Sequence, residues 1–218
     1  EPAEPFPYED MGYSTKGEEK RKKTAYFALN RNKKSIGINL RSEEGQKIFY
    51  RMAGEADVII EGYRPGVVKR LKIDYDTVKA INPRVIYCSL SGYGQDGPYR
   101  LYPGHDINYI SQAGILGLLG PKDDRPSIPL NLIADFAGVS LYGTVAILLA
   151  LRVRDMTGKG QYLDHTYMEG ALHLLTWFTQ EYFYNGTVIK RGESWALGGY
   201  PHYETYKTKD GKYISIGC

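Results

Sequence analysis

The chain has 218 residues, of which 42% are apolar and 24% are charged, and these values argue against disorder along most of its length. Its formal net charge of +3 is too small to indicate a nucleic-acid partner. The two cysteines, Cys88 and Cys218, lie far apart and outside any CxxC pattern, so neither a disulfide framework nor a metal site is expected. Reduced thiols suit a cytoplasmic or organellar setting.

The first 23 residues are predicted to form an irregular surface segment, which ends in a charge run over residues 16–23. This run is either a solvated loop or a group of bases that meets a polyphosphate. The chain ends in a strand pattern over residues 212–218 with nothing after it. We therefore expect the chain to be a fragment of a longer protein.

Strand and helix patterns alternate through the next part of the chain. The predicted strands are residues 35–40, 57–60 and 84–90, and the predicted helices are residues 43–54 and 76–81. Ser42 is placed to cap the first of these helices, with Glu43 and Glu44 in its first turn. Because strands that alternate with helices require crossover connections, this order predicts an α/β fold with a parallel sheet.

The longest helical pattern covers residues 130–154 and ends at Thr157-Gly158. Its charge-free part, residues 136–151, is shorter than the ~20 residues that a membrane span needs, so we interpret it as a buried core helix. A stripe of small side chains suits close packing: Gly143, Ala146 and Ala150. The large apolar side chains gather on one face: Leu141, Val145, Leu148 and Leu149.

The other predicted elements are a glycine-rich loop over residues 92–102, a mixed and partly helical segment over 105–117, a strand over 161–165 and a helix over 168–185. Asp210-Gly211 predicts a hairpin that joins strands over residues 203–207 and 213–216.

The loop over residues 92–97 fits the dinucleotide pattern GxGxxG and follows a predicted strand. A dinucleotide site needs a helix N-terminus at this point to hold the pyrophosphate. Pro98 and the residues after it do not start a helix, so a tight loop shaped by its glycines is preferred.

Two titratable residues stand out as candidates for chemistry. His105 lies among polar neighbours that could orient an imidazole, although a lone histidine in a loop is most often structural. Asp135 is a single carboxylate in an apolar stretch, and it is either a helix N-cap or a partly desolvated acid or base. Arg64 follows a parallel strand and, with Arg70, either meets a phosphate or lies on the surface.

Six stretches together resemble the family III CoA-transferases and, within them, the α-methylacyl-CoA racemase branch. They are NRNKKSIGINLRSEEG, ADVIIEGYRPGVVKRL, NPRVIYCSLSGYGQDGPY, GHDINYIS, PLNLIADFAG and TGKGQYLDHTYMEG. The branch depends on His105. Family members that transfer CoA carry an aspartate at the position of Asp135, and the racemases add a histidine in a GHDINY motif, which here covers residues 104–109.

This resemblance implies a parallel-sheet, Rossmann-like large domain over residues 1–185, without its first strand, and the start of a smaller α+β domain over residues 186–218. It also implies an interlaced homodimer and an acyl-CoA substrate. We expect no cofactor, since CoA is part of the substrate. We also expect no metal, no nucleic-acid partner and no membrane partner. A cytoplasmic location is expected, or a mitochondrial or peroxisomal one in a eukaryote.

The resemblance assigns acid–base catalysis to His105 and Asp135. It assigns CoA binding to Ile38, Asn39, Leu40, Arg41, Gly62, Tyr63, Arg64, Arg70, Gly104, Asp106, Ile107, Asn108 and Tyr109. In the racemases a glutamate that supports the histidine would lie beyond Cys218, so this chain alone is not expected to be active.

These assignments predict a racemase that interconverts (R)- and (S)-2-methylacyl-CoA thioesters through an enolate. Backbone N–H groups at the start of the Asp135 helix are predicted to stabilise that enolate. The first alternative is a CoA-transferase in which Asp135 attacks the thioester. The second is a non-catalytic CoA-binding protein that uses the basic residues.

Overall fold

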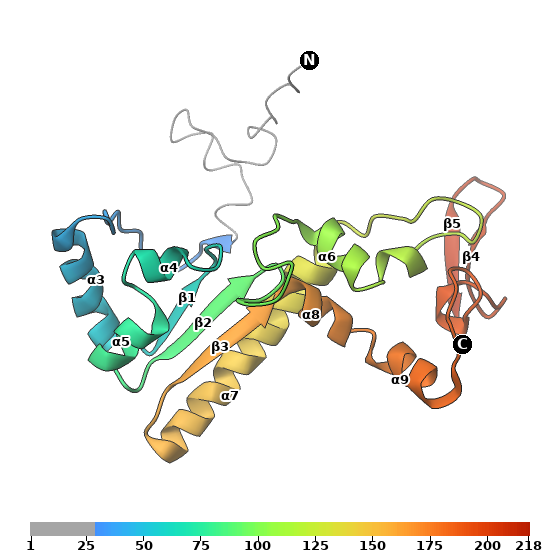
Figure 1. Ribbon diagram of the computed structural model, residues 1–218. Coiled ribbons are helices and arrows are strands. Elements are labelled where there is room, and N and C mark those ends of the chain that lie inside the picture. The colour runs from blue at the N-terminus through green and yellow to red at the C-terminus, as the bar shows by residue number, and fades with distance from the viewer. Residues whose placement is uncertain (1–28) are drawn as a thin grey trace. The chain divides into compact units, whose positions relative to one another are not determined.

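The computed structural model describes residues 29–218 (Figure 1). Residues 39–218 form one compact unit, and the elements described below belong to it. The charge run over residues 16–23 lies outside the described residues, so both of its interpretations stay predictions.

Three parallel strands form the main sheet, in the order β1-β2-β3: β1 (Val58–Glu61), β2 (Ile86–Ser91) and β3 (Gln161–Thr166). The predicted parallel sheet is therefore confirmed. The strand predicted over residues 35–40 is wrong, because within residues 29–218 no strand pairs with this segment. A strand needs a neighbour for its backbone hydrogen bonds, and this segment has no strand partner among the described residues.

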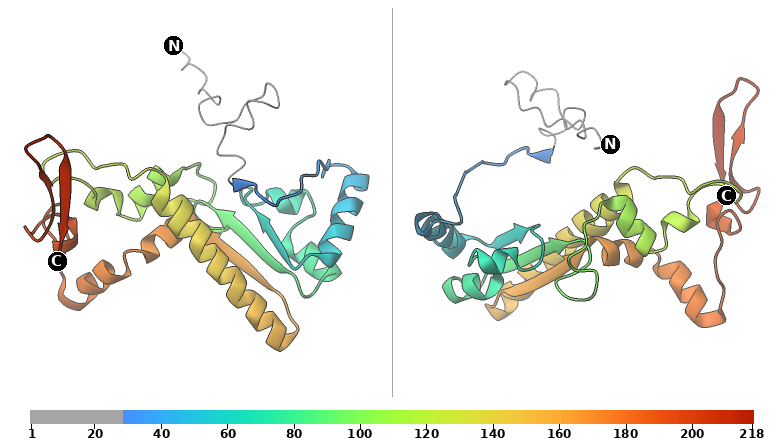
Figure 2. Two further views of the ribbon diagram at one scale, coloured as in Figure 1. Left: turned by 180° about the vertical axis from the view of Figure 1, so that it is seen from behind. Right: turned by 45° about the horizontal axis from the view of Figure 1, so that its top comes forward.

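The central strand β2 is buried on both faces, and this explains its continuous apolar pattern. Successive side chains point to opposite faces of the sheet. Tyr87 packs against Ala53 of α3 (Glu43–Glu55) and Val78 of α5 (Tyr75–Ile81). The opposite face of β2 and β3 contacts α7 (Tyr142–Thr157), which runs along it in Figures 1 and 2. The sheet therefore has helices on both faces.

The remaining elements are α4 (Val67–Arg70), α6 (Asp106–Gln112), α8 (Tyr167–His173) and α9 (Thr176–Asn185), with a π-helix η2 (Leu132–Leu141), 3-10 turns η1 (Leu116–Leu118) and η3 (Trp195–Leu197), and a hairpin of β4 (Tyr203–Lys207) and β5 (Tyr213–Gly217). The hairpin confirms the turn predicted at Asp210-Gly211, where Gly211 has a φ of 84°. The domain boundary after residue 185 stays a prediction.

Local sequence patterns correctly predicted the start of α3 and the end of α7. Ser42 Oγ accepts the N–H of Gly45 at 3.1 Å and so caps α3 as predicted. Gly158, with a φ of 75°, ends α7 and donates its N–H to the carbonyl of Arg154. Both contacts join residues a few positions apart, which is why a sequence pattern can predict them.

The prediction of one continuous helix over residues 168–185 is wrong, because the segment forms two helices, α8 and α9. At the break, the N–H groups of Leu174 and Leu175 donate to carbonyls three residues back, those of Ala171 and Leu172. Such tightened bonds end a helical turn. Leucine is a good helix former, so the sequence carries no local sign of this break.

The π-helix η2 and α7 are continuous, and together they form a 26-residue helix, Leu132–Thr157, that is long and apolar enough to cross a membrane by those two criteria alone. The small stripe packs as predicted, with Gly143 and Ala150 buried. The interpretation as a buried core helix is wrong for its other side, where Leu148 is 59% exposed. Its neighbours on that face are exposed too: Leu141, Val145 and Leu149.

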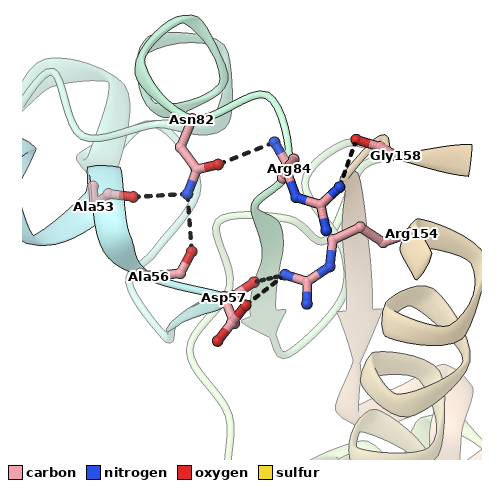
Figure 3. A network of polar contacts seen from close by, with 7 residues as sticks. All are labelled: Ala53, Ala56, Asp57, Asn82, Arg84, Arg154 and Gly158. Carbon is pink, nitrogen blue, oxygen red and sulfur yellow. Dashed lines mark hydrogen bonds and ion pairs between the residues drawn. The ribbon is translucent and has the colours of Figure 1, made fainter.

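A network of polar contacts ties segments together where the three strands begin (Figure 3). The side-chain amide of Asn82 donates to the carbonyls of Ala53 and Ala56, at 3.0 and 2.9 Å. Arg154 of α7 donates to the carboxylate of Asp57 at 2.8 Å. These contacts join the end of α3, the start of β1 and the end of α7. The loops at the opposite, carboxyl ends of the strands are where parallel sheets usually bind ligands.

Candidate active site

A cavity of about 670 Å³ lies at the carboxyl ends of β1 and β2. Residues after both strands line it, together with the loop that leads into α6, and residues of η2 and α8 complete it. Of the residues predicted for the site, eight line this cavity: Gly62, Tyr63, Arg64, Gly104, His105, Asn108, Tyr109 and Asp135. The two predicted catalytic residues, from segments 30 positions apart, therefore face one space.

His105 is the N-cap residue of α6, with extended backbone angles (φ −128°, ψ 176°). Its backbone N–H donates to Oδ1 of Asn108 at 3.0 Å, and the N–H of Asn108 donates back to the His105 carbonyl at 2.8 Å. These reciprocal bonds hold the backbone of His105 at the helix start. Its side chain is exposed toward the cavity, so the imidazole is accessible to a substrate.

Asp135 lies in the first turn of η2 and is half-buried. Burial raises the pKa of its carboxyl, and the negative charge of Asp106 raises it further. A hydrogen bond from Asn131, at 3.1 Å, and the nearby His105 act in the opposite direction and lower this pKa. A carboxyl with a raised pKa beside an imidazole is suited to proton transfer.

Asp106 performs the capping role that the sequence left open for Asp135. Asp106 is 4% exposed, and its Oδ2 accepts the N–H of Ala134 at 2.7 Å and that of Asp135 at 2.9 Å. The N-cap interpretation of Asp135 is therefore wrong. Backbone N–H groups at the start of the Asp135 helix were predicted to stabilise an enolate, and two of the groups in this turn are already engaged by Asp106.

The ring of Tyr109 fills the space beneath the glycines of the site. Its hydroxyl donates to the Gly104 carbonyl at 2.7 Å, and its ring centroid lies 5.0 Å from that of Tyr167. A Cβ atom on Gly104 or on Gly92 would lie 2.6 or 2.7 Å from the Tyr109 ring. Burial raises the pKa of Tyr109 to about 12, with smaller contributions from nearby tyrosines and Asp135, so its hydroxyl remains protonated at neutral pH. The glycines over residues 92–97 thus belong to a tight loop that is not followed by a helix, as predicted.

The loop after β1 is held by a buried carboxylate. Glu61 is 9% exposed, and its Oε2 accepts the N–H of Tyr63 at 2.8 Å. This bond shapes the turn that brings Arg64 to the cavity. Arg70 lies in α4 and does not line the cavity.

Several residues predicted to bind CoA lie elsewhere in the structure. Ile38 falls in the separate unit that ends at that residue. Four others are not among the cavity-lining residues: Asn39, Leu40 and Arg41, which precede α3, and Ile107 in α6. Their roles stay predictions.

The cavity residues that were missed from the sequence include Arg100, Tyr102 and Tyr167. Arg100 and Tyr102 belong to the loop that follows β2, so their position after a parallel strand was the sign that could have indicated them. Tyr167 begins α8, immediately after β3. With Arg64, Arg100 provides positive charge at a cavity that also holds His105 and Asp135, an arrangement suited to acid–base chemistry on an anionic substrate.

Comparison with known proteins gives this site a family. The model of CoA-transferase family III matches residues 4–218. Alpha-methylacyl-CoA racemase of Mus musculus is 38% identical over 190 residues, which are 87% of this chain and 50% of that protein. Succinyl-CoA:glutarate CoA-transferase of Mus musculus is 35% identical over 196 residues, 89% of this chain and 44% of that protein.

A solved structure supports the same assignment. A CAIB/BAIF family protein from Brucella suis matches with a TM-score of 0.79 and 37% identity, over 89% of this chain and 51% of that one. The chain spans about half the length of the curated relatives it matches. The sheet and its helices have the α/β fold of these neighbours. The chain belongs to CoA-transferase family III.

Proposed function

We propose that the complete protein is an isomerase that interconverts the (R) and (S) forms of 2-methylacyl-CoA thioesters. The observation that carries this proposal is the placement of His105 and Asp135 at one cavity, with a raised pKa on the Asp135 carboxyl. The 38% identity to an alpha-methylacyl-CoA racemase supports it as well.

The proposed reaction begins at the carbon next to the thioester carbonyl. One of the two residues removes the α-proton, and the electron pair of the C–H bond passes into an enolate. The other residue returns a proton to the opposite face of that carbon, so that the C–H bond re-forms with inverted configuration. Proton transfer by a positioned side chain contributes typically about 10²–10⁴-fold to the rate, and each group must be able to hold and release a proton.

The arginines at the cavity serve substrate binding in this proposal. Arg64 and Arg100 line the cavity, and guanidinium groups form charge-assisted hydrogen bonds with phosphate oxygens such as those of CoA. Binding energy from this remote part of the substrate can be used to orient the reacting carbon.

A CoA-transferase is the second candidate, because succinyl-CoA:glutarate CoA-transferase is 35% identical to the chain, close to the value for the racemase. In that reaction the Asp135 carboxylate attacks the thioester carbonyl, the C–S bond breaks, and CoA leaves as the thiolate, so that an acyl anhydride forms on Asp135. His105 would then have no required role.

The first prediction separates these two reactions. The complete protein is incubated with one enantiomer of a 2-methylacyl-CoA in deuterated water. We expect deuterium to enter the α-position, as followed by proton NMR, together with epimerisation of the released acid. CoA appearing on an added free acid, without exchange at the α-carbon, would instead establish the transferase.

Paired variants assign the residues. We expect His105→Ala and Asp135→Asn each to lower the exchange rate by about 10²–10⁴-fold. The matched controls are His173→Ala and Asp155→Asn, which change exposed residues that do not line the cavity and should retain the full rate. Full exchange in His105→Ala would exclude the proposed proton transfer by this residue.

A further inference from the structure

The start of η2 carries an arrangement that links the two proposed catalytic residues. His105 is the residue before α6, and Asp106 is the first residue of that helix. Ala134 and Asp135 are consecutive in η2 and lie 28 and 29 positions after Asp106. One carboxylate oxygen, Asp106 Oδ2, accepts the N–H group of Ala134 and that of Asp135.

We propose that Asp106 is a positioning residue for Asp135: its buried carboxylate holds the first turn of η2 so that Asp135 stays at the cavity beside His105. This inference rests on the proposed function of the site. It concerns the side chain of Asp106, which does not line the cavity.

The hydrogen bonds at this turn explain why the position of η2 depends on Asp106. The first N–H groups of a helix have no partner inside the helix. Asn131, the residue before η2, makes no cap bond to them, because its side chain instead donates to Asp135 Oδ2. Asp106 therefore supplies from another helix the acceptor that the turn lacks. The bond to the Asp135 N–H fixes the backbone from which the proposed catalytic carboxyl extends.

The charge of Asp106 indicates a role beyond support. Its second oxygen, Oδ1, is buried and has no hydrogen-bond partner among the described residues, and burying such an atom costs stability. A neutral side chain could accept the same two N–H groups. The negative charge, however, acts on Asp135, whose pKa it helps to raise, after the larger effect of burial. The other groups that face Asp135 are Asn131, His105, Tyr109 and Tyr167.

The test, our second prediction, uses two substitutions in the complete protein. Asp106→Ala removes both acceptor and charge, and we expect kcat for α-proton exchange to fall about 10²-fold, since small misplacements of a reacting group have effects of this size. KM should change much less. Asp106→Asn keeps an oxygen that can accept both N–H groups, and it should retain kcat within about tenfold of the unmodified protein.

The pH dependence distinguishes positioning from general support. Because the like charge of Asp106 raises the Asp135 pKa, removing it in Asp106→Asn should lower that pKa. For the enantiomer whose proton Asp135 removes, the acid limb of the pH–rate profile should then move to lower pH. The matched control is Asp74→Asn, because Asp74 caps α5 by accepting the Thr77 N–H at 3.3 Å and lies outside this cavity. It should leave the profile unchanged.

A measurement without turnover keeps this inference separate from the proposed function. The Asp135 carboxyl is titrated by carbon-13 NMR, with Asp135→Asn used to assign its signal. A lower Asp135 pKa in Asp106→Asn, but not in Asp74→Asn, is expected even if the protein proves inactive on 2-methylacyl-CoA, an outcome that would overturn the proposed function alone. An unchanged Asp135 titration in Asp106→Asn, or a folded Asp106→Ala that retains full kcat, would overturn the inference.

Discussion

At the scale of single residues, the contact between Gly104 and Tyr109 shapes the candidate site. The Gly104 carbonyl accepts the Tyr109 hydroxyl, and the Tyr109 ring lies where a side chain at residue 104 would begin. Tyr109 also packs in a core cluster with Ile110 and Ala134, next to Asp135. A change at Gly104 therefore reaches both His105, its neighbour in the chain, and the helix that carries Asp135.

The third prediction follows from this contact. In Gly104→Ala the new Cβ would lie 2.6 Å from the Tyr109 ring, and forcing an extra carbon into a packed region typically costs about 1–3 kcal/mol. We expect a lower melting temperature and a lower exchange rate, measured by calorimetry and by the deuterium assay. Gly117→Ala is the control, because a Cβ there meets nothing within 4 Å. Equal melting temperatures for the two variants would contradict the packing argument.

At the scale of elements, η2 and α8 cross at two glycines. A Cβ on Gly170 of α8 would overlap the backbone of Gly138 in η2, and a Cβ on Gly138 would approach the Ala171 N–H at 2.8 Å. Because both neighbours are backbone, no side-chain rotation can relieve the overlap. This close crossing sets the place of η2, and with it that of Asp135.

The fourth prediction contrasts two helical glycines. Gly170→Ala should destabilise the fold by about 1–3 kcal/mol, because the helices must move apart. Gly54→Ala, in α3, meets only Ile81 at 3.8 Å. It should stabilise the fold by about 0.4–1 kcal/mol, because alanine loses less backbone entropy in a helix. Denaturant unfolding of both variants measures the difference, and the same sign for both would contradict the interpretation of the crossing.

At the scale of the whole molecule, the apolar face of α7 is exposed in the described part of the chain. Its large side chains, among them Leu148 and Leu149, are exposed. An exposed apolar patch commonly marks an interaction surface. We propose a second copy of the complete protein as the partner, in agreement with the homodimer that the family resemblance implies.

The fifth prediction concerns this assembly. We expect sedimentation equilibrium of the complete protein to give twice the mass of one chain at micromolar concentrations. Leu148→Glu would bury a charge in an apolar interface, which costs stability unless it is paired, and it should weaken the dimer. Lys159→Glu changes an exposed residue outside this face and is the control. A monomer at all concentrations would exclude the dimer.

Local order was largely predictable from the sequence because its causes are local. The Ser42 cap, the end of α7 at Gly158 and the hairpin turn at Gly211 each depend on residues a few positions apart. The apolar run of β2 predicted a buried parallel strand for a similar reason. The motifs around His105 and Asp135 likewise indicated the family that the comparisons then showed.

Tertiary structure alone decided the features that depend on distant segments. Only packing shows that β3 takes the third place in the sheet, that one face of the long helix is exposed, and that the helix after Tyr167 breaks at Leu174. The same holds for Asp106, whose carboxylate meets N–H groups 28 and 29 residues away. No local pattern encodes such a contact, because its partners are set by how α6 and η2 pack. The sequence therefore named Asp106 and Asp135 as candidates without revealing the contact between them.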